Sequence, residues 1–298
     1  MEIAVLGAGS LGSLVGGALA RHHDVTLVGR DPHVAAVRAE GLRVEGTESF
    51  VVHPRVTTDD EGLSADLAVV TTKAFDTPAA ADALATGDLD AVLSLGNGMG
   101  NEAALADRLD APVVGGTTAL GATLEAPGRV AWLGRGETVV GPWTDDAGAA
   151  TRAAGRAFDD AGLSTTVTAN VRARLWEKLA ANAAINPLTA LAGVRNGAVL
   201  DDPLGGTAAA AAREVARAAR ASGVDLSGGA AVEAAARVAR ATAANRSSMA
   251  QDLAAGRRTE VDAINGHVVD RVGPDAAPVN ATLAALVRAR GDGGIGEV

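Results

Sequence analysis

Lys73 and Lys178 are the only two lysines in the chain, although lysine and arginine together number 26. A lysine presents a compact ammonium that can give up a proton, a task for which the arginine guanidinium is unsuited. Both positions are therefore candidates for proton transfer or ligand binding, with chance survival of two lysines as the alternative.

Lys178 belongs to a polar row on a predicted helix over residues 171–192 that is otherwise rich in apolar residues. Lys178, Asn182 and Asn186 recur every four residues and so share one helix face. Amides beside a single lysine indicate a buried polar pocket, with hydrogen bonding between helices as the alternative. Pro187 lacks a backbone N–H, so we expect the helix to kink or end there and to free backbone groups near the pocket.

A glycine-rich turn follows the first predicted strand, which covers residues 2–6. The turn and the start of the next helix are formed by Gly7, Ala8, Gly9, Ser10, Leu11 and Gly12. Glycines at this spacing permit a tight turn and let a pyrophosphate approach the backbone at a helix N-terminus. The pattern predicts dinucleotide binding, and a glycine turn without a ligand is the alternative.

Arg30 lies just after the second predicted strand, over residues 24–28, where NAD-binding proteins commonly place an acid for the ribose hydroxyl. An arginine there suits the 2′-phosphate of NADP(H), because it can form paired charge-assisted hydrogen bonds. Asp31 follows directly, and a shift of one residue would present its carboxylate instead. NADP(H) is therefore the favoured cofactor, while NAD(H) and a purely solvated Arg30 stay open.

Lys73 and Asn97 follow two later predicted strands, over residues 67–71 and 91–95. The carboxyl ends of parallel strands meet at the edge of a sheet where α/β proteins bind their ligands. Both side chains are thus candidates for cofactor or substrate contacts. An asparagine before a glycine, as in Asn97-Gly98, is also a common turn residue.

Four polar residues near the C-terminus complete the candidate set: Asn245, Ser248, Asp252 and Glu260. Ser248 offers a small donor and acceptor to a substrate, and Asp252, on the same helix face, could orient a neighbour. Helix capping is the alternative for both. Glu260 could equally be an acid of a helix's first turn.

Strands and helices alternate up to about residue 168, with a further strand over 112–114, which is typical of a Rossmann-type, doubly wound α/β sheet. We expect residues 129–133 and 138–140 to form a small antiparallel addition at the sheet edge. Long helices follow over 171–192, 205–222, 228–253, 260–272 and 280–290. The sequence thus predicts a dinucleotide-binding domain over 1–168, an all-helical substrate-binding and catalytic domain over 169–298, and a cleft between them.

Composition limits the function further. The net charge of −10 argues against a nucleic-acid surface, and the 48% hydrophobic content suits globular cores. There is no cysteine, and the five histidines show no metal or triad spacing, so no metal site is expected. Residues 1–6 lack the basic start of a targeting segment, and no membrane span is evident, so we expect a cytoplasmic protein. A homodimer stays open.

Together these motifs resemble the ketopantoate reductase (2-dehydropantoate 2-reductase) family over nearly the whole chain. The stretches that carry the resemblance are Gly7 to Gly12, Thr72 to Ala74, Asn97 to Gly100, Trp176 to Ala190, Ser247 to Asp252 and Thr259 to Gly266. The resemblance implies NADPH-dependent reduction of 2-dehydropantoate (ketopantoate) to (R)-pantoate, in the biosynthesis of pantothenate and coenzyme A.

The resemblance also implies roles for individual residues. Lys178 resembles the general acid that protonates the developing alkoxide, and Glu260 resembles the second essential group, which contacts the substrate hydroxyl and helps to position Lys178. The substrate-binding set implied is Asn182, Asn186, Ser248 and Asn245. The cofactor set implied is Gly7 to Gly12, Arg30, Lys73 and Asn97.

Two other functions remain open on the sequence. A relative of the same architecture could act on another branched 2-keto acid or on a 3-hydroxy acid. A non-catalytic NADP sensor is the other alternative. The row from Lys178 to Asn186 argues against the sensor, because a sensor needs no proton donor.

Overall fold

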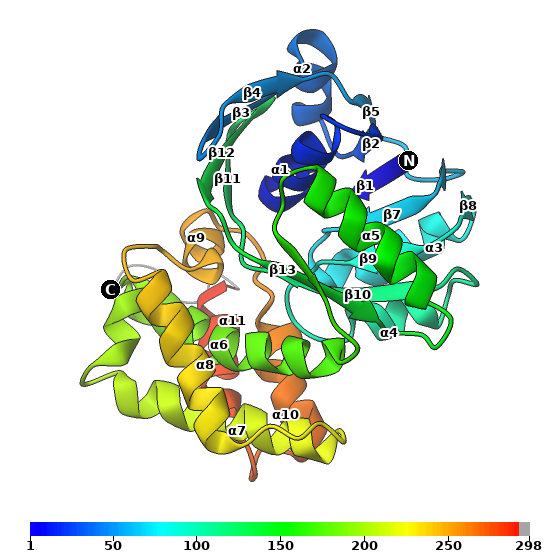
Figure 1. The fold of residues 1–298 in the computed structure, drawn as a ribbon. Helices are drawn as coiled ribbons and strands as arrows, with labels where there is room; N and C mark the ends of the chain where they lie inside the picture. The colour runs from blue at the N-terminus through cyan, green and yellow to red at the C-terminus, as the bar shows by residue number, and fades with distance from the viewer. Residues whose placement is uncertain (292–298) are drawn as a thin grey trace. The chain divides into compact units, whose positions relative to one another are not determined.

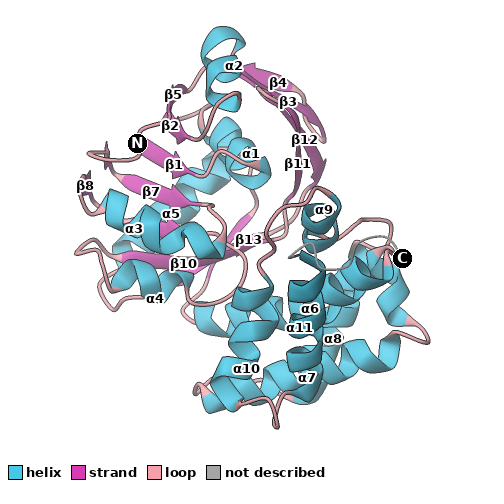
Figure 2. Ribbon diagram, turned by 180° about the vertical axis from the view of Figure 1, so that it is seen from behind, coloured by secondary structure: helices cyan, strands magenta, loops and turns pink. Residues whose placement is uncertain are grey.

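The computed structural model describes residues 1–291 and divides into two compact units (Figures 1 and 2). One unit contains residues 1–96 and 100–171, and the other contains residues 97–99 and the chain from Arg172 onward. Within residues 1–291, all strands belong to the first unit and the second is built from helices. The predicted fold class is therefore confirmed. The functional division at residues 168 and 169 stays a prediction, and residues 292–298 of the predicted second domain lie outside the described residues.

An eight-stranded sheet forms the centre of the first unit, in the order β14-β13-β10-β9-β7-β1-β2-β5. From β5 to β10 every neighbouring pair is parallel. The chain runs from β1 to β2 on one side and later returns to β7 on the other, which creates the switch point where α/β proteins bind ligands. The strands are β1 (Glu2–Leu6), β2 (Asp24–Val28), β5 (Arg55–Thr57), β7 (Leu67–Val70), β9 (Val92–Ser94), β10 (Val113–Thr118), β13 (Thr138–Pro142) and β14 (Thr165–Val167). A separate short pair joins β6 (Ser64–Ala65) and β8 (Asp88–Leu89).

Helices cover both faces of this sheet. Alternate residues of β1 show the two faces: Ile3 and Val5 belong to one buried cluster, while Ala4 and Leu6 belong to another. The first cluster includes residues of α1 (Ser10–Leu19) and α5 (Gly148–Asp160), and the second includes residues of α3 (Thr77–Leu84) and α4 (Asn101–Ala106). The remaining helices of this unit are α2 (His33–Glu40) and the short η1 (Ala74–Asp76). A sheet buried on both faces explains why its strands read as continuous apolar runs.

A second sheet corrects the prediction for residues 129–133 and 138–140, which do not pair with each other. Its order is β11-β12-β3-β4, made of β11 (Gly121–Ala126), β12 (Arg129–Gly134), β3 (Leu42–Gly46) and β4 (Phe50–Val52). β12 pairs with β11 and β3, whereas β13 pairs with β10 and β14 in the main sheet. The reason is burial: Trp132 of β12 is 1% exposed and packs in the cluster that contains α1.

Helix α1 lies between the two sheets, and two small residues make this position feasible. A Cβ on Gly16 would lie 2.2 Å from Leu27 of β2, and one on Gly17 would lie 3.0 Å from Leu42 of β3. Larger side chains would push the helix away from one sheet or the other. The second sheet therefore holds the helix that follows the glycine-rich turn.

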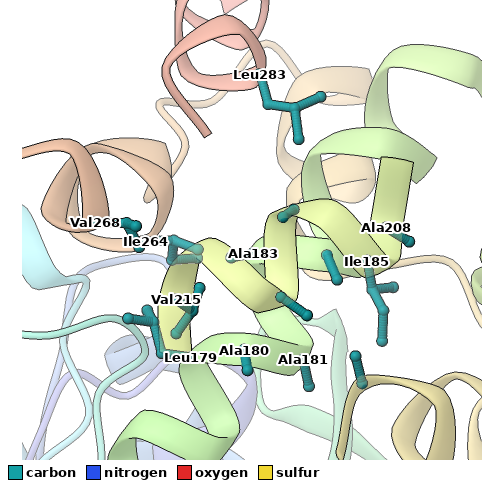
Figure 3. Close-up of a cluster of buried hydrophobic side chains, with 14 of the residues drawn as sticks. Leu179, Ala180, Ala181, Ala183, Ile185, Ala208, Val215, Ile264, Val268 and Leu283 are labelled. Atoms are coloured by element: carbon teal, nitrogen blue, oxygen red, sulfur yellow. The ribbon is translucent and has the colours of Figure 1, made fainter. Parts of the chain in front are cut away.

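Helix α6 (Val171–Ala192) forms the centre of the helical unit. Its residues Leu179 to Leu188 supply much of a buried cluster that also includes Val215, Ile264 and Leu283 from other helices (Figure 3). The surrounding helices are α7 (Gly205–Ala221), α8 (Gly228–Ala241), α9 (Ser248–Ala254), α10 (His267–Val272), α11 (Pro278–Gly291) and the short η2 (Asn196–Leu200). A helix buried on nearly all sides explains why its polar row is conspicuous in the sequence. Within residues 1–291, no helix combines the length and apolar character needed to span a bilayer.

The helix does not end at Pro187, because α6 continues through it to Ala192. A proline at this position leaves the carbonyl group four residues earlier, that of Ala183, without its helical donor. Asn265 supplies a substitute: its Nδ2 donates to the Ala183 oxygen at 3.1 Å. A side chain distant in sequence thus satisfies the carbonyl that was expected to be free.

Two of the predicted helices also differ in form. The helix expected over 228–253 is two helices, α8 and α9, because the segment between them bonds to η2 and Ser247 caps α9 by accepting from the Ala250 N–H at 3.2 Å. The helix expected over 260–272 begins as a π-helix, η3 (Asp262–Gly266), and continues as α10. A π-helix is wider than an α-helix and often occurs at functional sites.

Candidate functional site

The glycine-rich turn has a geometry that requires glycine at two positions. Gly7 has a φ of 93°, and a Cβ there would lie 2.8 Å from the Thr72 nitrogen. A Cβ on Gly12 would lie 2.3 Å from the Gly7 oxygen. Because nothing larger fits, the turn keeps β1 and α1 in close contact and leaves room for a group to approach the backbone.

The backbone N–H groups at the start of α1 form the part of this turn that could hold an anion. The first helical bond runs from the Ser13 N–H to the Gly9 oxygen at 2.9 Å, so the N–H groups of Ser10, Leu11 and Gly12 precede it. Such groups bind phosphates at helix N-termini. The Ser10 hydroxyl accepts from the Leu124 N–H at 2.9 Å, which fixes α1 against β11.

Arg30 and Asp31 differ in what their side chains do at the end of β2. The Arg30 side chain is 91% exposed, and its one ionic partner within residues 1–291 is Asp76, at 3.9 Å. Asp31 Oδ1 accepts from the Ala35 N–H at 3.1 Å, so this carboxylate already bonds to the first turn of α2. The guanidinium is therefore the more accessible of the two groups.

Lys73 lies half-buried after β7, immediately before η1. The neighbouring Thr71 hydroxyl donates to the oxygens of Leu6 and Gly7, at 2.9 and 3.0 Å. This contact joins the carboxyl ends of β1 and β7 and holds the glycine turn. Lys73 is thus placed at the switch point of the sheet, as its position in the sequence predicts.

The polar row of α6 runs from a partly exposed part of the helix into its buried part. Lys178 and Asn182 are half-buried, and Asn186 is 7% exposed. Their neighbours in the helix, from Leu179 to Ile185, are otherwise buried apolar residues. A lysine and two amides held by a rigid buried helix can present donors and acceptors to a small ligand with little freedom to move.

Ser248 and Asn245 are both exposed and lie at the start of α9. The position of this helix is fixed by a buried contact in which the hydroxyls of Thr189, on α6, and Ser247 hydrogen-bond at 2.7 Å. Asp252 is 5% exposed and accepts from Arg257 Nε at 3.0 Å, so it holds the segment that leads toward Glu260.

Glu260 and Asn97, which are 163 residues apart in the sequence, come together in the helical unit. Asn97 Nδ2 donates to Glu260 Oε2 at 3.4 Å, and Glu260 is 6% exposed. The short segment of residues 97–99 is held on η3, because the Met99 N–H donates to the Ala263 oxygen at 3.0 Å. Gly98 is required there, since a Cβ would lie 2.6 Å from that of Ala263.

Thr189, Ser247 and Asn265 have no site role predicted from the sequence, yet their hydrogen bonds hold the helices that carry the predicted residues. The role of Ser247 as a helix cap could be found from the sequence, because a serine directly before a predicted helix is a typical N-cap residue. The role of Asn265 could not be found from local sequence patterns, since its partner Ala183 is 82 residues away. Among residues 1–291 no group of three or more potential metal-ligating side chains gathers.

His33 links the first turn of α1 to the segment before β12. It is 6% exposed, its Nδ1 accepts from the Gly128 N–H at 3.0 Å, and its Nε2 lies 3.0 Å from the Ser13 hydroxyl. Since Nδ1 accepts, the ring proton of the neutral form is on Nε2 and is donated to Ser13. Burial lowers the pKa of His33 below its ordinary value of 6.5.

This lowered pKa predicts a stability that depends on pH. The folded state resists protonation of His33 more than the unfolded state does, so its contribution is complete above pH 6.5 and is lost as the pH falls through the lowered value. We expect His33→Gln to reduce the slope of unfolding free energy against pH, between the lowered pKa and pH 6.5, by up to about 1.4 kcal/mol per pH unit. Urea unfolding at several pH values measures it.

Part of the slope should persist in the variant, because burial also lowers the pKa of His267; the Asp270 carboxylate opposes this effect and the Arg271 guanidinium adds to it. Identical slopes for the wild type and His33→Gln would contradict the predicted role of His33.

Comparison with known proteins gives a consistent result for both units. The family model "Ketopantoate reductase PanE/ApbA" matches residues 3–145, and "Ketopantoate reductase PanE/ApbA C terminal" matches residues 170–291. A curated 2-dehydropantoate 2-reductase of Halobacterium salinarum is 46% identical over 97% of this chain and 98% of its own length. One from Pyrococcus horikoshii is 38% identical over 97% of both chains.

Solved structures agree. The crystal structure of a PanE/ApbA family ketopantoate reductase from Ralstonia eutropha superposes with a TM-score of 0.88 at 35% identity, covering 98% of this chain and 99% of that one. The similarity therefore extends over both units and the whole candidate site.

Proposed function

This chain belongs to the ketopantoate reductase family, and we propose that it reduces 2-dehydropantoate to (R)-pantoate with a nicotinamide cofactor, a step toward pantothenate and coenzyme A. The observation that carries this proposal is the row of Lys178, Asn182 and Asn186 on the buried helix α6. This helix lies in the part of the chain that matches the C-terminal family model, and the N-terminal model matches the first unit. A proton donor on a rigid support is what reduction of a ketone requires.

The residues of the first unit fit a dinucleotide. The two positions where a Cβ would collide, Gly7 and Gly12, allow close approach of a pyrophosphate, and the N–H groups of Ser10 to Gly12 would hold it. When bound, the cofactor supplies a hydride to the substrate carbonyl carbon. Lys73 of this unit and Asn97 of the second unit are the proposed contacts nearer the reacting end.

NADP(H) is the proposed cofactor rather than NAD(H). Arg30 offers an accessible guanidinium after β2, whereas the carboxylate of Asp31 bonds to the start of α2. A guanidinium matches a 2′-phosphate in geometry and in charge. The same comparison weakens the alternative in which Asp31 binds the ribose hydroxyls.

In the second unit, we propose that Lys178 gives its proton to the carbonyl oxygen as negative charge develops there. A cation directed at that oxygen stabilises the transition state more than the ground state. Glu260 would accept from the terminal hydroxyl of the substrate and help to position Lys178. Its own bond from Asn97 would orient the carboxylate.

The remaining substrate-binding residues proposed are Asn182, Asn186, Ser248 and Asn245. Amides and a hydroxyl can both donate and accept, which suits a substrate that carries a carboxylate, a ketone and a hydroxyl. We also propose a small-molecule substrate rather than a nucleic acid, given the net charge of −10, and a cytoplasmic reaction, where NADPH is available.

Substrate profiling tests the proposal. Purified protein should consume NADPH with ketopantoate at a kcat/KM well above that with 2-oxoisovalerate, which lacks the hydroxyl that Glu260 would bind, and should not oxidise 3-hydroxyisobutyrate at a comparable rate with NADP. A preference for either alternative would assign the chain to another substrate within the same architecture.

A further inference from the structure

Asn265 contacts α6 where Pro187 interrupts the internal hydrogen bonds of this helix. Pro187 cannot donate to the Ala183 oxygen, and Asn265 Nδ2 does so instead at 3.1 Å. Ala183 follows Asn182 directly, and Pro187 follows Asn186. The contact therefore lies in the turn of α6 that joins the two amides of the polar row.

The side chain of Asn265 is itself held on its far side. Its Nδ2 also donates to Asn280 Oδ1 at 2.8 Å, and Asn280 in turn donates to the Ala211 oxygen at 3.1 Å and to Glu214 Oε2 at 2.7 Å. Asn265 and Asn280 are fully buried. The two bonds from Asn265 Nδ2 fix the position of this amide, because breaking either would leave a buried acceptor unpaired, although Asn265 Oδ1 itself has no hydrogen-bond partner within residues 1–291.

The backbone segment that carries Asn265 also supports two other proposed site residues, Glu260 and Asn97. Asn265 belongs to η3, the π-helix that begins two residues after Glu260. The Ile264 N–H of this helix donates to the backbone oxygen of Glu260 at 3.1 Å. The same segment binds residues 97–99 through the Ala263 oxygen. One short helix thus supports Glu260, Asn97 and, through Asn265, helix α6.

We propose that Asn265 is a positioning residue, which keeps α6 continuous through Pro187 and so holds the row of Lys178, Asn182 and Asn186 in a fixed relation to Glu260. This inference rests on the proposed function for its catalytic consequence. Asn265 touches neither substrate nor cofactor in this role. It acts through the Ala183 carbonyl, and its loss should affect the chemical step more than cofactor binding.

A double-mutant cycle with Pro187 tests the inference, because Pro187→Ala restores the N–H that Asn265 replaces. Asn265→Ala should lower kcat for ketopantoate about tenfold, with the KM for NADPH changed by less than about twofold. Pro187→Ala alone should keep kcat within about twofold of the wild type. In the double variant kcat should return to within about twofold of that of Pro187→Ala.

Asn196→Ala is the matched control, since it removes another buried amide of the helical unit, which donates to Thr242 Oγ1 at 3.0 Å. This control should lower the stability but leave kcat unchanged, and Pro187→Ala should not correct its stability. A double variant Asn265→Ala/Pro187→Ala as slow as Asn265→Ala would overturn the inference. If Asn265→Ala alone is insoluble, a soluble double variant supports it and an insoluble one overturns it.

Amide hydrogen exchange gives a readout that does not need activity. Exchange in residues 183–192 of α6 should accelerate in Asn265→Ala and return toward the wild-type rate in the double variant. Absence of ketopantoate turnover by the wild type would contradict the proposed function and leave this measurement intact. Unchanged exchange in Asn265→Ala would overturn the positioning role itself.

Discussion

Lys178→Ala should lower kcat for ketopantoate by about 10²-fold or more, while the Kd for NADPH changes by less than about twofold. The proposed proton donor is lost, but the glycine turn and Arg30, which belong to the other unit, are untouched. Steady-state kinetics with ketopantoate and fluorescence titration with NADPH measure the two quantities separately.

Two comparisons sharpen this prediction. Lys178→Arg keeps the positive charge but not a proton that can be given up, so it should remain far slower than the wild type. Small primary amines added to Lys178→Ala should restore part of the rate. An equal loss of kcat and of NADPH affinity would instead identify Lys178 as a structural or cofactor-binding residue.

Arg30→Ala should raise the KM for NADPH by at least about tenfold and leave the KM for NADH nearly unchanged, because only NADPH carries the 2′-phosphate. Among the residues that the structure describes, the Arg30 side chain has no close partner to lose, since Asp76 lies 3.9 Å away and Arg30 is 91% exposed. Initial rates with each cofactor at saturating ketopantoate provide the ratio.

Arg55→Ala is the matched control, because Arg55 is another exposed arginine of the same unit, on the neighbouring strand β5. It should leave both Michaelis constants unchanged. Asp31→Ala should cost about 1 kcal/mol of stability through loss of its bond to the start of α2, with no effect on the KM for NADH. An equal response of both cofactors to Arg30→Ala would disprove the cofactor assignment.

The sequence was sufficient for features whose signal is local. Gly7 to Gly12 between a strand and a helix identified the dinucleotide-binding fold, and the spacing of Lys178, Asn182 and Asn186 placed them correctly on one helix over residues 171–192. The identity of the substrate came from the family resemblance, because no spacing specifies a pantoate skeleton.

Features that depend on distant contacts were not predictable in this way. The pairing of β12 with β3 joins strands about 86 residues apart, and burial of Trp132 rather than the short loop to β13 decides it. The continuity of α6 through Pro187 depends on Asn265, and the placement of Asn97 depends on Glu260. In each case a contact between residues distant in the sequence decides a feature that local sequence patterns alone do not specify.

Transfer of an isotopic label tests the central proposal most directly. With NADPH that carries deuterium at both hydrogens of nicotinamide C4, direct hydride transfer predicts (R)-pantoate with deuterium on C2, formed with consumption of one NADPH per product. Mass spectrometry and chiral chromatography of the product measure both. Ketopantoate recovered unchanged, or pantoate without deuterium at C2, would contradict the proposal that this chain catalyses direct hydride transfer to ketopantoate.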